Sequence, residues 1–131
     1  MSSPETAMPP TPRKLSTHQK AVLIHVLVAF PGQKVTVFYS RDATDALAYA
    51  QDFVTIFKSI EWNVNDPEPV EIAIPQSSGL AFIVSRMPGL PTGAEALRDT
   101  LRIYGIEVAT VCDSARNIAS GAFILAVGRA M

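Results

Sequence analysis

The sequence predicts an α/β domain: a small mixed, mainly parallel β-sheet of about four or five strands with three helices packed on it. Two strand–helix–strand passages, at residues 34–64 and 80–111, carry this prediction, because such units pair their strands in parallel through right-handed crossovers. The chain has 131 residues, 48% of them hydrophobic, which suits one core rather than several. We expect the last strand to add antiparallel at or near an edge of the sheet.

The first helix is expected to begin after Ser16, which can form a capping box with Gln19, and to run to about Phe30. Between residues 21 and 30 it is apolar almost all round. Such a helix needs cover on most sides. The cover can come from its own core or from a second subunit, and both readings stay open.

Capping residues predict the other two helices. Asp42 to Asp45 cap a helix that runs to about Ser59, with a wide apolar face for the sheet. Thr92 and Glu95 form a second capping box, and Gly105 closes that helix.

Short apolar or β-branched runs predict the strands. The segment 80–84 is apolar throughout, as expected for a strand covered on both faces. Prolines within 65–69 favour a kinked or broken edge strand there, and 75–79 reads as a turn. The expected strands are 34–39, the broken edge strand formed by 61–64 and 70–74, 80–84, 106–111 and 121–127.

Composition argues against several classes of function. Eleven basic and twelve acidic residues give a net charge of −1, so we expect no nucleic-acid partner. One cysteine and two histidines make neither an intramolecular disulfide nor a usual zinc site, and a reducing cytoplasm is the simplest location. We expect no cofactor and no bound metal.

The start of the chain looks different from the rest. Residues 1–14 are rich in Ser, Pro and Thr, and we expect them to form a disordered head before a single domain at 15–131. The longest apolar stretch, 21–30, is shorter than the roughly 20 residues of a membrane span. We therefore expect no membrane span.

A weak internal echo suggests one ligand site. Ser40-Arg41 and Ser85-Arg86 each end a predicted strand and precede a helix, the second of which starts at Thr92. If the two strands lie side by side in parallel, these residues meet at the carboxyl edge of the sheet, where open α/β folds bind ligands. Arginines and helix N-termini suit an anion such as a nucleotide or a phosphorylated metabolite. The alternative is that the serines are ordinary caps and the arginines only reach solvent.

Catalytic patterns are weak. His18 and His25 both lie on the first helix, with no nucleophile beside them in sequence, and seven residues along a helix is too far for one metal ion. Cys112 could be a reactive thiol, but a buried small hydrophobe is the favoured interpretation. The leading hypothesis is a non-catalytic interaction or regulatory domain that self-associates through its first helix or an exposed sheet edge. An anion-binding domain is the alternative.

Several short runs, spread over about residues 15–129, resemble a small α/β domain found in uncharacterised bacterial proteins, often after N-terminal membrane helices. The resemblance implies the fold and a bacterial origin, and no activity. This chain departs from the pattern because it shows no membrane segment. The runs that carry the resemblance are Pro31-Gly32-Gln33-Lys34-Val35, Ile60-Glu61-Trp62-Asn63-Val64, Gly79-Leu80-Ala81-Phe82-Ile83-Val84, Gly105-Ile106 and Val127-Gly128.

Overall fold

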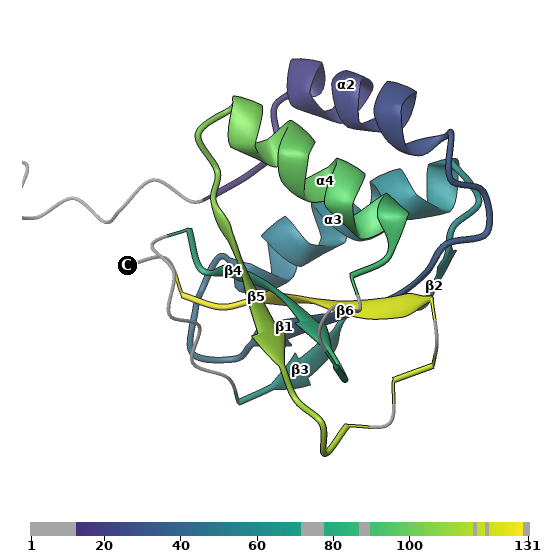
Figure 1. Cartoon of the computed structure of the whole chain (residues 1–131). Helices are drawn as coiled ribbons and strands as arrows, with labels where there is room; N and C mark the ends of the chain where they lie inside the picture. Colours follow the sequence, from purple (N-terminus) through teal and green to yellow (C-terminus); the bar gives the residue numbers. More distant parts are fainter. Residues whose placement is uncertain (1–12, 72–77, 87–89, 117, 120, 130–131) are drawn as a thin grey trace, which may run out of the picture.

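The computed structural model describes residues 13–71, 78–86, 90–116, 118–119 and 121–129. Residues 1–12 of the expected head at 1–14, residues 72–74 of the expected strand at 70–74 and most of the expected turn at 75–79 lie outside these ranges. The predicted fold class is confirmed: three helices pack on a mixed, mainly parallel sheet (Figure 1). The elements are α2 (Thr17–Leu27), β1 (Lys34–Ser40), α3 (Ala46–Ser59), β2 (Asn63–Val64), β3 (Glu68–Val70), β4 (Leu80–Val84), α4 (Thr92–Ile103), β5 (Val108–Cys112) and β6 (Ala122–Val127).

The sheet has the strand order β2-β1-β6-β4-β5, and β3 also pairs with β1. All pairs are parallel except β4 with β6. The expectation that the last strand lies at or near an edge is therefore wrong. β6 lies in the centre of the sheet, parallel to β1 and antiparallel to β4.

All three helices lie on one face of the sheet (Figure 1). They cover a core rich in aromatic side chains, in which Phe53, Phe57, Phe82 and Phe123 are fully buried. The indole of Trp62 stacks on Phe57 with ring centroids 4.8 Å apart. Aromatic burial of this kind contributes a large part of the hydrophobic stabilisation of a small domain.

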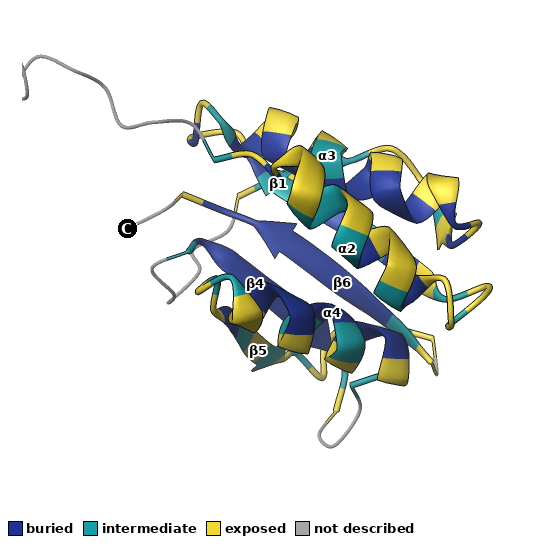
Figure 2. Cartoon of the chain, turned by 90° about the horizontal axis from the view of Figure 1, so that it is seen from above, coloured by how far each residue is buried: buried dark blue, intermediate teal, exposed yellow. Residues whose placement is uncertain are grey.

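Helix α2 is only half covered. Its capping box between Ser16 and Gln19 is present as predicted. Figure 2 shows it lying between α3 and α4, and it contacts both. Leu23 and Leu27 are buried, while many of its other residues are exposed. Val28 on its outer side is 54% exposed. The domain's own core therefore covers one side of this helix and leaves the other to solvent.

The other two helix starts differ from expectation. Asp45 precedes α3 but makes no capping hydrogen bond to it, and its carboxylate binds Arg13 instead. Thr92 is the first residue of α4 rather than its cap, and no capping box forms; Pro91 occupies the cap position. Proline there leaves the first turn without a side-chain acceptor.

The face of the sheet away from the helices carries a second, smaller apolar cluster. Val70 and Ile118 pack against it from the sides, and the guanidinium of Arg116 lies 5.4 Å from the ring centroid of Phe38. The buried members are Phe38, Ala81, Ile83, Ile124 and Ala126. No described helix covers this face.

Candidate functional site

The topology separates the residues of the predicted anion site. Tyr39 in β1 pairs with Val127, which pairs in turn with Leu80 at the start of β4. Ser40-Arg41 therefore lies where β4 begins, and Ser85-Arg86 lies where β4 ends, roughly 15–20 Å away along a strand of this length. The condition for that site, side-by-side parallel pairing of β1 and β4, is not met, because β6 lies between them and β4 runs the other way.

At the first of these ends, Ser40 has a structural role. It is 4% exposed, and its Oγ accepts a hydrogen bond of 3.3 Å from the backbone N–H of Asp42. Such a bond stabilises the turn that leaves β1. Arg41 beside it is exposed.

The same end of the sheet contains an arginine that sequence reasoning placed in the head. Arg13 donates to both carboxylate oxygens of Asp45 at 2.9 Å, and to the carbonyl oxygens of Ser78 and Gly128. It also lies 5.1 Å from the ring centroid of Tyr49. One side chain thus ties the start of the domain to α3, to the turn before β4 and to the end of β6.

Two ionisable groups around Arg13 have shifted pKa values. Hydrogen bonds from Arg13, together with its charge, outweigh partial burial and lower the pKa of Asp45 to about 2. Burial, with a smaller contribution from the charge of Asp52, raises the pKa of Tyr49 to about 12 against the opposing charge of Arg13. A bidentate pair whose arginine also donates to two carbonyl oxygens fixes the chain and offers little to a ligand.

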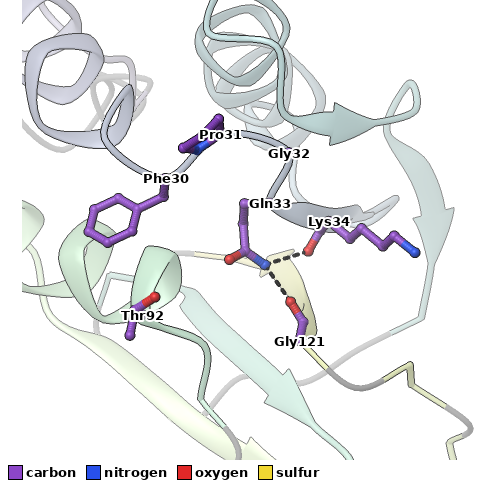
Figure 3. A pocket seen from close by; sticks show the side chains of 7 residues that line it. All are labelled: Phe30, Pro31, Gly32, Gln33, Lys34, Thr92 and Gly121. Carbon is purple, nitrogen blue, oxygen red and sulfur yellow. Dashed lines mark hydrogen bonds between the residues drawn. The ribbon is translucent and has the colours of Figure 1, made fainter.

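Thr92 lies at the other end of the sheet, beside a shallow hollow of about 350 Å³ (Figure 3). The Gln33 amide points into it and donates to the carbonyl oxygens of Lys34 at 3.0 Å and Gly121 at 2.7 Å. Ser85 is half-buried and Arg86 is exposed, and neither lines this hollow. Of the predicted site residues, the hollow is therefore lined by Thr92 but by neither arginine.

Strand β5 is an edge strand, and no described strand pairs with its outer side. Its sequence is Val-Ala-Thr-Val-Cys, without charge or proline. Edge strands usually carry a charge, a proline or a bulge that prevents pairing with another chain. Thr110 and Cys112 are exposed, so the expected burial of Cys112 is wrong.

Other chemistries find little support among the residues that the structure describes. His18 and His25 are exposed on α2, and His18 packs edge-on against Tyr104. No group of three His, Cys, Asp or Glu side chains there could hold a metal ion. No helix within the described ranges is long and apolar enough to cross a membrane.

Comparison with known proteins adds no relative: no family model, curated protein or solved structure matches the chain.

Proposed function

We propose that this chain is a non-catalytic protein-interaction domain that self-associates by antiparallel pairing of β5 with β5 of a second copy. The observation that carries the proposal is that β5 has no charged residue and that no strand among the described residues pairs with its outer edge. Main-chain hydrogen bonds along such an edge recruit an added strand in many recognition domains.

The hydrogen bonds of β5 determine which of its residues face outward. The N–H of Asp113 donates to the carbonyl oxygen of Val84 at 2.8 Å, so residue 113 faces β4. Backbone groups of alternate residues point to opposite sides of a strand, so residues 111 and 109 also face β4. The free N–H and C=O groups are therefore those of Val108, Thr110 and Cys112.

These groups allow one fully overlapping antiparallel register. With the twofold axis at Thr110, this residue pairs with Thr110 of the second copy, and Val108 pairs with Cys112. Each is a hydrogen-bonded pair that exchanges two main-chain bonds. On the side of the sheet away from the helices, the half-buried Val111 would lie opposite Ala109 of the second copy and become covered by it.

Charges at the two ends of β5 tolerate this register. Glu107 would lie opposite Asp113 of the second copy, which alone would be repulsive. Each acid has an arginine of its own, however: Arg102 lies 3.7 Å from Glu107, and Arg116 lies 3.2 Å from Asp113. Each end of the pairing would then hold two acids and two arginines.

The test is the oligomeric state of Thr110→Lys, measured by light scattering at micromolar concentration. Two lysines facing each other on the axis should turn a dimer into a monomer. Thr55→Lys places the same charge on the exposed side of α3 and should stay dimeric. Ile24→Glu charges the outer side of α2, the other surface considered for self-association, and should also stay dimeric.

A second measurement guards against misfolding of the lysine variant. Thr110→Cys in a Cys112→Ser background should be cross-linked by a short bismaleimide, whereas Thr55→Cys in the same background should not. A monomeric parent protein, or a Thr110→Lys variant that remains dimeric, would overturn the proposal. Loss of the dimer in Ile24→Glu alone would move the interface to α2.

A further inference from the structure

A groove of about 320 Å³ lies on the face of the sheet away from the helices, where β1 and β6 begin. Its size falls at the lower end of the range for small-molecule sites, roughly 300–1,000 Å³. It lies over β2, β1 and β6, at the opposite side of the sheet from β5. Polar and apolar side chains both line it, among them Lys34, Thr36, Phe38, Asn63, Asn65 and Ile124.

The register of the sheet explains the polar side of this groove. Lys34 pairs with Asn63 of β2, and Thr36 lies two residues further along β1. Val35 between them is buried on the helix side, so Lys34 and Thr36 face the groove. Asn65 follows β2 with the same two-residue spacing from Asn63.

The apolar side comes from the neighbouring strand and from the segment before it. Ile124 pairs with Thr36, and Phe38 follows on the same face of β1. Ile118 packs against this apolar cluster. Both Ile118 and the exposed Ala119 line the groove. One side of the groove is thus hydrocarbon and the other offers amides, a hydroxyl and an ammonium group.

The chemistry of this lining defines the ligand class. Lys34 is the one charged residue among the described lining residues. The acids of the neighbouring segment are Glu68, which pairs with Phe38 four residues along β1 from Lys34, and Asp66, which is bound by Lys58 at 2.7 Å. We propose that the groove binds a small amphipathic carboxylate, with its hydrocarbon body against Phe38 and Ile124 and its anionic end beside Lys34.

The test uses octanoate as the anionic probe and octanol as its uncharged counterpart, each titrated into the full chain and followed by amide chemical shifts in nuclear magnetic resonance spectra. We expect saturable octanoate shifts confined to the groove residues. Lys34→Gln should weaken octanoate binding about 2- to 5-fold, the range of a solvent-exposed ion pair, and leave octanol unaffected. Lys14→Gln removes an exposed lysine elsewhere and serves as the matched control.

Ala119→Phe should abolish binding of both probes, because it places a ring in the groove from an exposed position. Shifts scattered over the surface, or no saturable shift, would overturn the proposal. So would an octanoate affinity that is equal in the parent, Lys34→Gln and Ala119→Phe. These readouts are independent of self-association, since Thr110→Lys leaves the groove intact.

Discussion

Replacing Asp45 by Asn removes the carboxylate that Arg13 holds through two side-chain hydrogen bonds. A carboxyl whose pKa falls from 3.8 to about 2 on folding stabilises the folded state by roughly 2–3 kcal/mol, since one pKa unit corresponds to about 1.4 kcal/mol. The Asp45 side chain is 21% exposed, so solvent screens part of this interaction. We expect Asp45→Asn to lower the free energy of unfolding at neutral pH by about 1–2 kcal/mol.

The loss should depend on pH in one direction. The pKa of Asp45 is lower in the folded state than in the unfolded chain. Its stabilisation is therefore complete above the ordinary carboxyl pKa of about 4 and disappears as the pH falls toward 2. The parent and Asp45→Asn should differ at neutral pH and converge in acid.

Urea denaturation followed by the fluorescence of Trp62 measures this directly, because Trp62 is the chain's one tryptophan and is buried. Asp66→Asn is the matched control. It removes a carboxylate paired with Lys58 whose side chain is 86% exposed, and should change the stability little or not at all. Equal stability of Asp45→Asn and the parent at neutral pH, or a difference that persists unchanged in acid, would refute the reasoning.

Two further predictions concern the turn at Gly79 and the titration of Tyr49. Gly79 and Gly105 both have positive φ, at 71° and 75°, but a Cβ at Gly79 would lie 2.6 Å from the Arg13 Nη1 and 2.7 Å from the Arg129 carbonyl oxygen, while Gly105 has open space. In urea denaturation Gly105→Ala should cost about 1 kcal/mol and Gly79→Ala about 1–3 kcal/mol more, and equal losses would argue against a tight turn at Gly79. An absorbance titration should show one of the three tyrosines ionising near pH 12, a step that Tyr49→Phe removes. Because the pKa of Tyr49 is raised in the folded state, its stabilisation is present below about pH 10 and lost as the pH rises toward 12; three tyrosines titrating together near 10 would contradict the burial of Tyr49.

The sequence predicted the elements well because their signals are local. The capping box at Ser16, the β-branched run that became β1 and the apolar stripe of α3 each depend on residues within a few positions of one another. Element bounds in the structure differ from the predicted ones by a few residues, as expected because the ends of helices fray.

Arg13 could not be found this way. Its partners Asp45, Ser78 and Gly128 lie 32, 65 and 115 residues away in the chain. No periodicity or motif links an arginine to two distant carbonyl oxygens, and the Pro-rich residues before it made a disordered head the natural reading. Only the folded topology brings these groups together.

The position of β6, in contrast, was readable from its sequence. Its six residues are all apolar, and five of them are buried. An uninterrupted apolar strand needs cover on both faces and a neighbour on each side, which an edge position does not provide. The edge position was expected because β6 is the last strand in the sequence. Its apolar composition, which favours a buried central position, is the better indicator.

Placing β6 between β1 and β4 has consequences for both candidate sites. Since β4 is antiparallel to β6 and β6 is parallel to β1, the carboxyl ends of β1 and β4 lie at opposite ends of the sheet, and so do Ser40-Arg41 and Ser85-Arg86. In this strand order β5, which contains the exposed Thr110, lies at one edge of the sheet, and β2 and β3 lie at the other. The apolar β6 is thus enclosed by two neighbouring strands, whereas β5, with two exposed residues, lies at an edge.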